Sequence, residues 1–509
     1  MGFQTDIFKD EQCSPDYIEW LIDEHFIALH NRFALLWEYY ANPSAPAELL
    51  GKSSASAGRC YVQAQEYGLP SRITGIVHSA SSGVFQGQRA SDVQRKEVVI
   101  ENDIAWRINA AVDFLFGKPI SFVSKSPDGQ RRTEIESILN AVFEANGGTG
   151  FFQAMAVLGS VYGFIDCLVR PGNELTESIS YSSQTSSFSD VLKMAQAIGL
   201  ELIEATRALP VLEENDYRRI RYYVQHFYEK RNSLRRTGSF LERLLSPGKR
   251  ASDSRQVTAV TEIISASAWQ RYEDKQLVAE GELPWGFLPV VHIQNIAQPY
   301  YYEGQSDVEA LVPLQDELNT RLSDRASRIT FQSFKMYLGK GIEGFEDRPV
   351  SPGRMWCTDN PEAAIEEFGG DAATPSEDLH ITEIREALDK ASAVTPLVAG
   401  ILKSKLGNLT SAVALRLTLM GMLSKTERKR FTYGEGLKKI AKMILAILDS
   451  ANIYKTGGAD REIDIIFPSP LPENMLEKLQ EAQIKKELGV PVEQVLKELG
   501  YESSYNNEQ

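Results

Sequence analysis

Two amphipathic segments on either side of a stretch rich in glycine and proline constrain this fold more than any other sequence feature. Residues 307–333 place apolar side chains on one side at steps of three or four residues, which predicts a helix of roughly 40 Å; they are Leu311, Leu318, Leu322 and Ile329. A second helix is predicted over 376–392, ended by Thr395 and Pro396 because proline cannot continue a helix. Residues 334–375 between them are interrupted by glycine and proline and predict a small β unit. The chain is therefore expected to contain a hairpin of helices, one leading into the β unit and one returning from it.

Upstream of this hairpin, the sequence predicts helices first and strands later. Ser14 is a candidate N-cap with Pro15 in the first turn behind it. Helices are predicted over 14–41, 101–116, 133–145 and 150–158. Residues 161–169 alternate like a strand, and the strand-like patterns between 200 and 300 make that region the β-rich part of the chain.

Downstream of the hairpin, a long amphipathic segment is predicted over 411–449, and the tail over 473–500 reads as two short helices separated by Gly489 and Pro491. Two stretches lack such patterns. Residues 42–95 are rich in Pro, Gly, Ser and Ala and are expected to be irregular, while the Ser/Thr-rich residues 176–190 indicate a loop or linker.

Length and charge narrow the class of protein. At 509 residues the chain is expected to form several structural units around a sizeable core. The 54 basic and 69 acidic residues give a formal charge of −15, which argues against a broad surface that grips nucleic acid, because such binding needs Lys and Arg to neutralise phosphates. An acidic wall is nevertheless compatible with DNA that slides past, since it offers few sites of attachment.

Cysteine usage and hydropathy give no sign of secretion or of a membrane. Cys13, Cys60, Cys167 and Cys357 are far apart and form no CxxC pair, so neither a disulfide scaffold nor a metal site is expected. The N-terminal residues do not resemble a signal peptide, and no apolar run approaches the about 18 residues that span a bilayer. We therefore expect assembly in a reducing cytoplasm and no membrane partner.

Motifs for catalysis are also missing. The segment PAELLGKS over 46–53 has Pro46 where a phosphate-binding loop needs glycine, and no apolar strand precedes it. His25 and His30 are five residues apart and miss the spacing of a zinc-binding helix. No nucleophile elbow is present, and the acidic pairs at 213–214 and 366–367 have the character of solvated loop charges. No catalytic residue, metal site or cofactor is predicted.

Five segments, taken in their order along the chain, resemble the portal protein family of long-tailed bacteriophages. They are ENDIAWRINAAVDFLFGKPISF (101–122), ALPVLEENDYRRIRYYVQHFYEK (208–230), WGFLPVVHIQN (285–295) with GQSDVEALVPLQDELNTRLSD (304–324), LTSAVALRLTLMGMLSKTERKR (409–430) and PSPLPENMLEKLQEAQIKKELGVP (468–491). The main departure is Ala412, where the family usually has glycine at the turn into its long helix. Residues 42–95 and the Ser/Thr-rich stretch have no counterpart in the family and are expected to be local elaborations.

The resemblance implies a mainly helical α+β portal fold, divided along the chain. Residues 1–306 correspond to the wing, with helices first and the β-rich part over 200–300. The stem helices, the clip, the tunnel loop, the long wing helix, and the crown with the C-terminal tail follow in a fixed order: 307–333 (stem), 334–375 (clip), 376–392 (stem), 393–410 (tunnel loop), 411–450 (wing helix) and 451–509 (crown and tail).

The resemblance also implies a non-enzymatic function and a set of partners. Portal subunits form a dodecameric ring at one capsid vertex, through which double-stranded DNA is packaged, retained and ejected without sequence specificity. The expected partners are the large terminase subunit, a head-completion or adaptor protein, and the major capsid and scaffolding proteins. The protein is expected in the virion, and in the host cytoplasm during assembly. Since the sequence has no phosphate loop, the ATP hydrolysis that packaging needs is expected from the terminase motor.

Two lysines are candidates for contact with DNA. Lys403 and Lys405 lie in a short segment flanked by Gly400 and Gly407. Alone they indicate a solvated lysine pair, but within a ring they predict a cationic collar that touches phosphates without reading bases. A further run of cations either pairs with acidic groups of a neighbouring subunit or covers a helix face: Lys425, Arg428, Lys429 and Arg430.

Phe345 and Trp356 are candidate anchors for the motor and the head-completion protein, because aromatic side chains are favoured at interfaces. The alternative is that both fill the small core of the clip itself. The apolar sides of the two stem helices are expected to exceed what one subunit covers, which places Leu318 in a seam between subunits.

Two other classes of protein stay open at this point. One is a different head–tail connector or a minor capsid structural protein with the same helix-and-strand plan. The other is an enzyme whose site the motifs do not reveal.

Overall fold

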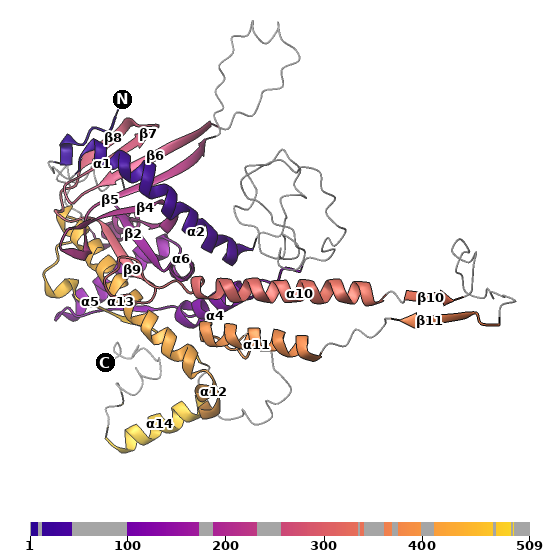
Figure 1. The fold of residues 1–509 in the computed structure, drawn as a ribbon. Coiled ribbons are helices and arrows are strands. Elements are labelled where there is room, and N and C mark those ends of the chain that lie inside the picture. Colours follow the sequence, from indigo (N-terminus) through magenta and orange to yellow (C-terminus); the bar gives the residue numbers. More distant parts are fainter. Residues whose placement is uncertain are drawn as a thin grey trace, which may run out of the picture.

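The computed structural model describes most of the chain with several gaps. The described ranges are 2–8, 13–42, 99–172, 187–231, 256–333, 336–340, 361–368, 375–398, 412–471, 475–489 and residue 492. Helices hold more of these residues than strands do, which confirms the predicted mainly helical α+β class. Figure 1 shows a layered body from which one long arm projects.

The body is built around two antiparallel sheets. A five-stranded sheet has the order β4-β5-β6-β7-β8, and a three-stranded sheet has the order β3-β2-β9. The bounds are β2 Phe164–Arg170, β3 Gly199–Ile203, β4 Ala208–Glu213, β5 Asp216–Arg231, β6 Gln256–Ile264, β7 Ala268–Glu273, β8 Gln276–Glu282 and β9 Val290–Gln294. The strands predicted between 200 and 300 are therefore present.

The two sheets meet through polar groups that are shielded from solvent. Tyr223 of the five-stranded sheet donates to the buried carboxylate of Asp166 in β2 at 2.7 Å, and Glu262 pairs with Arg170. Buried polar atoms are costly unless paired, so these contacts fix how one sheet lies on the other. A separate apolar cluster fills the opposite face of the five-stranded sheet, where Ile18 and Phe26 of the N-terminal helices pack against Tyr222 and Ile263.

Helices cover the outer sides of both sheets and fill the space around them. The N-terminal helices α1 (Pro15–Trp20), η2 (Leu21–His25) and α2 (Phe26–Ala41) cover the five-stranded sheet, and α13 (Met420–Ser450) packs on β9 and β2 of the three-stranded sheet. The remaining body elements are η1 Asp6–Phe8, α4 Asp103–Phe116, β1 Ser121–Ser124, α5 Gly129–Ala145, α6 Thr149–Tyr162, α8 Phe188–Gln196, η4 Ala205–Arg207, α12 Ala412–Thr418, η7 Ala459–Arg461, β12 Ile463–Ile466 and α14 Met475–Glu487. From α1 to α13, Figure 1 thus shows helix, sheet, sheet and helix in layers.

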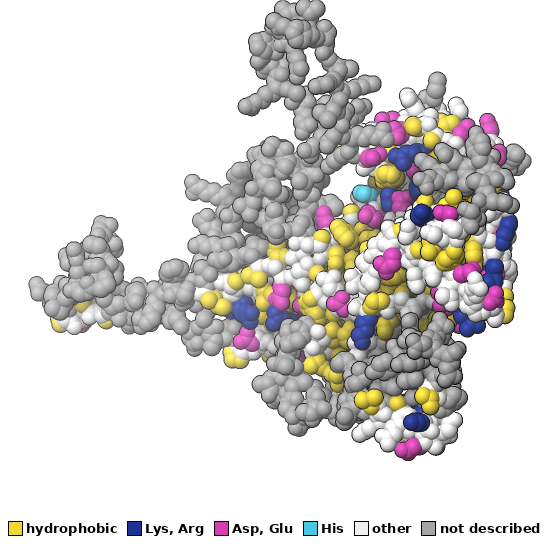
Figure 2. All heavy atoms as spheres, turned by 180° about the vertical axis from the view of Figure 1, so that it is seen from behind, with side chains coloured by type: hydrophobic (Ala, Val, Ile, Leu, Met, Phe, Trp, Pro, Cys, Tyr) yellow, Lys and Arg dark blue, Asp and Glu magenta, His cyan; other side chains and the backbone are white. Residues whose placement is uncertain are grey.

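The arm is the hairpin that the sequence predicts. A short turn, η5 (Glu309–Leu311), leads into α10 (Val312–Ser333), and α11 (Pro375–Ser392) returns beside it. At the far end, β10 (Met336–Lys340) and β11 (Ala364–Phe368) pair antiparallel, from Met336 opposite Phe368 to Lys340 opposite Ala364. Seen from behind, the base of the arm carries basic and acidic side chains beside hydrophobic ones (Figure 2).

Local sequence signals explain several element boundaries. The Ser14 hydroxyl accepts a hydrogen bond from the Tyr17 amide at 3.3 Å, and Pro15 follows it as predicted. The helix predicted over 14–41 is continuous in space but contains the π-helical turn η2. The long amphipathic segment breaks at Leu419 into α12 and α13.

Two predictions are corrected by the structure. The strand predicted over 161–169 begins only at Phe164, because Val161 and Tyr162 complete α6 before Gly163 breaks the helix with a φ of 94°. Strands β7 and β8 lie within the predicted β-rich part, although the turn between them uses Asp274 and Lys275 at positive φ in place of the usual glycine. The end of the Ser/Thr-rich stretch is helical: Ser187 caps α8.

Several predicted features lie outside the described residues. They are the irregular stretch after residue 42, most of the Ser/Thr-rich stretch, and the end of the tail beyond residue 492. Within the tail, α14 is present, and Gly489 follows it with a φ of 88°.

The expectation that neighbouring subunits must cover Leu318 is wrong. Its side chain is 0% exposed within the single chain, and Leu311 and Leu322 are also buried. The single chain leaves other apolar residues of the arm in solvent, since Ile329 is 46% and Leu379 is 61% exposed. The inner side of the arm is therefore part of the chain's own core.

This burial predicts that Leu318 stabilises the subunit itself. Leu318→Ala should lower the free energy of unfolding by about 2–5 kcal/mol, because it removes buried apolar atoms and leaves a cavity. The matched control Leu379→Ala should change it by less than about 0.5 kcal/mol, as exposed substitutions usually do. Urea denaturation at one fixed subunit concentration measures both, and equal losses in the two variants would contradict the assignment.

Candidate functional site

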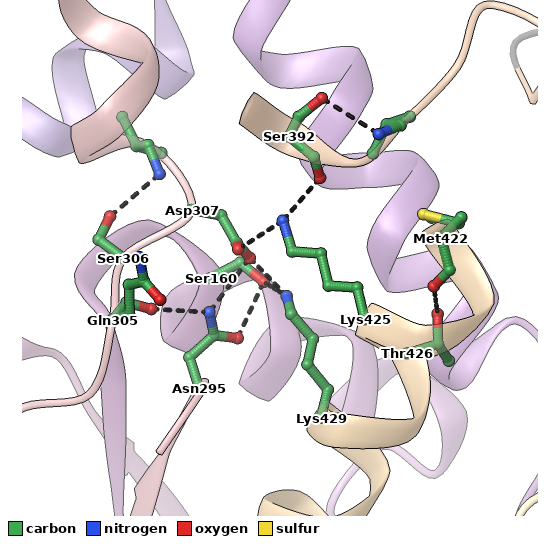
Figure 3. Close-up of polar contacts among 12 residues, drawn as sticks. Ser160, Asn295, Gln305, Ser306, Asp307, Ser392, Met422, Lys425, Thr426 and Lys429 are labelled. Carbon is green, nitrogen blue, oxygen red and sulfur yellow. Dashed lines mark hydrogen bonds and ion pairs between the residues drawn. The ribbon is translucent and has the colours of Figure 1, made fainter. Parts of the chain in front are cut away.

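The arm joins the body at a buried cluster of charged and polar side chains. Figure 3 shows that its members come from segments far apart in the sequence: α6, the end of β9, the turn before α10, the end of α11, and α13. We call this cluster, formed by Ser160, Asn295, Asp307, Lys425 and Lys429 with the Ser392 carbonyl, the arm joint.

Asp307 is the centre of the arm joint. Its carboxylate accepts from the Lys425 ammonium at 2.8 Å on Oδ1 and from the Lys429 ammonium at 2.5 Å on Oδ2. The Asn295 side-chain amide donates to Oδ2 at 3.1 Å. The Asp307 side chain is 4% exposed, so these groups replace the water that a surface carboxylate would bind.

Each lysine also holds a second element. Lys425 donates to the main-chain carbonyl of Ser392, the last residue of α11, at 2.8 Å. A cation at that place is favourable because helix C-termini carry partial negative charge. Lys429 donates to the hydroxyl of Ser160 in α6 at 2.8 Å. Since both lysines lie one turn apart on α13, this single helix holds the start of the outgoing arm and the end of the returning arm.

The turn before α10 is shaped by its own short sequence. The Ser306 hydroxyl accepts from the amides of Val308 and Glu309 at 3.1 and 3.3 Å, which caps the start of the arm, and it donates to the Val161 carbonyl at 2.6 Å. Gly163 permits this close approach: an added Cβ would lie 2.3 Å from the Gly304 carbonyl oxygen. The Asp307 amide donates to the Ser160 carbonyl at 2.8 Å, so main chain and side chain are both held.

Two cations share one anion in the arm joint. Burial alone would raise the pKa of the Asp307 carboxyl, but the two ammonium groups and their hydrogen bonds outweigh it and lower that pKa well below its usual range. Burial lowers the pKa of Lys429, and Asp307 offsets this effect in part. Burial, with Asp307 nearby, raises the pKa of Tyr433 well above its usual value, so its hydroxyl stays neutral and donates to Asn295 at 3.2 Å.

A second set of contacts holds α10 along its length. Gln315, Asn319 and Ser323 lie one turn apart on α10 and are all buried. They accept from the main-chain amides of Asp103, Glu101 and Val99 at 3.1, 2.9 and 2.9 Å. Gln315 also donates to the Glu101 carbonyl at 2.6 Å. Residues 99–103, which lead into α4, therefore lie along α10.

The returning helix has an ion pair of its own with α4. Arg107, whose side chain is 2% exposed, pairs with Asp389 of α11 at 2.6 Å and with Asp103 at 3.4 Å. Burial nevertheless lowers the pKa of this guanidinium below its usual value. Both arm helices are thus fixed to the body by charged or polar groups and not only by apolar packing.

The structure resolves one open question about the basic run. Lys425 and Lys429 pair with Asp307 of the same chain, so neither a neighbouring subunit nor a plain helix face explains them. Arg430 donates to the Pro468 carbonyl at 2.6 Å, and only Arg428 points into solvent. The helical spacing of the two lysines could have predicted their burial, since both fall on the apolar side of α13 with Met422, Tyr433 and Leu437.

The other candidate site residues lie outside the described residues. This holds for Lys403 and Lys405 in the predicted tunnel loop, and for Phe345 and Trp356 in the predicted clip. Among the described residues, no group of three or more His, Cys, Asp or Glu side chains is placed to hold a metal ion. No helix in that part of the chain is both long and apolar enough to cross a membrane.

Comparisons with known proteins give one family match and distant structural matches. Residues 107–504 match the family described as "Phage portal protein, SPP1 Gp6-like". Among solved structures, the fold is similar to a chain in "Virion of native gene transfer agent (GTA) particle", at 11% identity and a TM-score of 0.39, covering 78% of this chain and 89% of that one. A chain in "Neck of empty GTA particle computed with C6 symmetry" gives 13% identity and a TM-score of 0.40 with the same coverage. No curated protein sequence matches.

Because the family match spans most of its length, the chain belongs to the phage portal protein family. The predicted family is therefore confirmed, and the protein is a structural component of a phage particle. Proteins of this family associate with the capsid as an oligomeric ring.

The arm joint predicts an unequal cost for removing its charges. Asp307→Asn should destabilise the subunit by about 3–5 kcal/mol, since it leaves two buried cations without an anion. Lys429→Met should cost clearly less, because Asp307 and Lys425 still form a neutral pair. Urea denaturation at neutral pH compares the two variants, and an equal or larger loss for Lys429→Met would contradict the arrangement.

The pH dependence has a defined sign. The folded-state pKa of Asp307 is lowered, so its contribution is fully present above the unfolded value of about 4 and is lost as the pH falls below that value. The stability difference between wild type and Asp307→Asn should therefore be constant from pH 5 to 7 and shrink below about pH 4. A constant difference down to pH 2 would show that Asp307 titrates normally.

Proposed function

We propose that this chain is the subunit of a dodecameric portal ring through which double-stranded DNA is packaged, retained and ejected. The observation that carries the proposal is the long helical arm of a chain of the portal family. The start of its outgoing helix and the end of its returning helix are both held by one body helix, α13. An arm held this firmly is suited to line a channel whose contents exert force on the wall.

In this proposal the parts of the ring are those that the family resemblance implies. The body before α10, residues 1–306, would form the wing, and α10 and α11 would be the two stem helices. The segment with β10 and β11, residues 334–375, would be the clip at the narrow end of the ring. Residues 393–410 would be the tunnel loop, 411–450 the long wing helix, and 451–509 the crown and C-terminal tail.

The overall charge supports passage of DNA without sequence reading. A formal charge of −15 on each subunit disfavours broad attachment of phosphates to the wall. Lys403 and Lys405 would then form a narrow cationic collar within an otherwise acidic bore. Contacts from such lysines are weak and screened by salt, so they hold the backbone loosely and ignore the bases.

The clip would be the docking place for partners, one after the other. The terminase motor would bind there during packaging and supply the ATP hydrolysis, and the head-completion protein would replace it afterwards. Phe345 and Trp356 would be the aromatic anchors of these contacts. The capsid and scaffolding proteins would contact the ring from its outer side.

Counting subunits tests the proposal most directly. Native mass spectrometry of the purified full-length chain should give a mass of twelve subunits, and negative-stain micrographs should show a ring with a central hole. A smaller assembly or no ring would instead favour another head–tail connector or a minor capsid protein.

The tunnel-loop lysines make a second prediction. Lys403→Ala combined with Lys405→Ala should leave ring assembly and the onset of packaging unchanged but reduce the fraction of DNA retained, because retention is tested when internal pressure is greatest. The matched control is Lys193→Ala on α8, an exposed lysine outside the arm. In vitro packaging followed by nuclease protection measures both stages. A block at ring assembly would place the two lysines in a subunit interface instead.

A further inference from the structure

The outer side of α13 carries a stripe of side chains that face solvent. Arg428, Phe431, Glu435, Lys439 and Lys442 follow one another at steps of three or four residues and all face solvent. Phe431 is 72% exposed although it lies in the middle of the longest helix. Among the described residues, Arg428, Lys439 and Lys442 have no ion-pair partner. We call these five residues the basic stripe.

A groove runs beside the basic stripe. It has a volume of about 500 Å³ and is lined on one side by Phe431, Glu435 and Lys439 of α13. Tyr217, Arg218, Tyr301 and Met443 are among its other lining residues. The groove therefore offers apolar and aromatic surface beside Lys439, and Arg428 and Lys442 lie on the same helix.

The N-terminal helices carry a stripe of opposite charge. Asp16, Trp20, Asp23, Glu24 and Ile27 face solvent along α1, η2 and the start of α2, and we call them the acidic stripe. Trp20 is 46% and Ile27 is 56% exposed. No Lys or Arg occurs from residue 13 to 31. Trp20 donates its indole N–H to Glu24 at 2.9 Å, which holds the aromatic ring beside the carboxylates.

The two stripes lie on opposite sides of the body. The N-terminal helices cover the outer face of the five-stranded sheet, and α13 covers the outer face of the three-stranded sheet, with Ile293 of β9 packed against Gly436. Both sheets lie between them, as the order from α1 to α13 in Figure 1 shows. One chain therefore cannot bring its own stripes together, whereas two copies can.

We propose that the acidic stripe of one subunit docks on the basic stripe and groove of the next subunit, with Trp20 and Ile27 against Phe431. The contact joins different surfaces of identical chains, and such head-to-tail contacts generate a ring when the rotation between neighbours closes. The stripes are similar in length, since at 1.5 Å per residue the basic stripe runs for about 21 Å and the acidic stripe for about 17 Å. Complementary charge favours the correct register and disfavours contact between two like faces. The inference rests on the proposed function, since it describes how the ring is joined.

Crosslinking between two introduced cysteines tests this contact. In a chain with Cys60→Ser and Cys357→Ser, the pair Ile27→Cys and Phe431→Cys should give a ladder of covalent oligomers with a short bismaleimide, read on a denaturing gel. Cys13 and Cys167 are buried and do not interfere. Either substitution alone should give no ladder, because each interface would then hold only one thiol. The control pair Leu379→Cys and Phe431→Cys places an equally exposed cysteine on the arm and should also give none.

Charge reversal provides an independent measurement. Lys439→Glu with Lys442→Glu should shift ring assembly to at least tenfold higher subunit concentration, and adding Asp16→Lys with Asp23→Lys should restore it. The proposed interface would be overturned if native mass spectrometry shows rings, the cysteine pair gives no ladder, and charge reversal leaves the assembly concentration unchanged. The two stripes would then bind another partner, for instance a capsid protein. That result would leave the proposed function standing, whereas a parent chain that forms no ring would count against the proposed function itself.

Discussion

One buried carboxylate determines how the two halves of this molecule are joined. Asp307 accepts from two lysines of α13, and a carboxylate out of water is stable only with such partners. The reverse also holds, since Lys425 and Lys429 could not be buried in the apolar side of α13 without Asp307 and the carbonyl of Ser392. Because each of these buried groups requires the others, they fix the position of the arm relative to the body.

Polar groups inside the molecule also set the register of the arm. Apolar packing alone would tolerate a small slide of α10 along its neighbours, but Gln315, Asn319 and Ser323 each pair with a main-chain group of residues 99–103. A slide would leave these buried groups unpaired, at a cost of about 1–3 kcal/mol for each. The arm is therefore held at its base by charge and along its length by hydrogen bonds, and its apolar contacts add stability without defining the position.

The sequence contains enough information for the class of fold and for most elements, because helical periodicity, N-caps and breakers are local signals. The hairpin of helices and the cap at Ser14 follow from such signals. The arm joint does not, since Ser160 is 135 residues from Asn295 and Asp307 is 122 residues from Lys429, and only the tertiary fold brings them together. The only sign of the joint in the sequence is that two lysines occupy positions of α13 that otherwise hold apolar side chains. A charged side chain at such a position indicates a buried partner of opposite charge.

The joint also connects the arm to the segment proposed to touch DNA. Residues 393–411 link the end of α11 to the start of α12, and α13, which follows α12, contacts the end of α11 where Lys425 donates to the Ser392 carbonyl. Any displacement of α13 therefore carries the end of α11 with it, and through Asp307 it carries the start of α10 as well. In the proposed ring, a force on Lys403 or Lys405 would reach both stem helices and the long wing helix at one point. The acidic and basic stripes lie on the N-terminal helices and on this same α13, so that force would pass from the bore to the neighbouring subunit through a single helix.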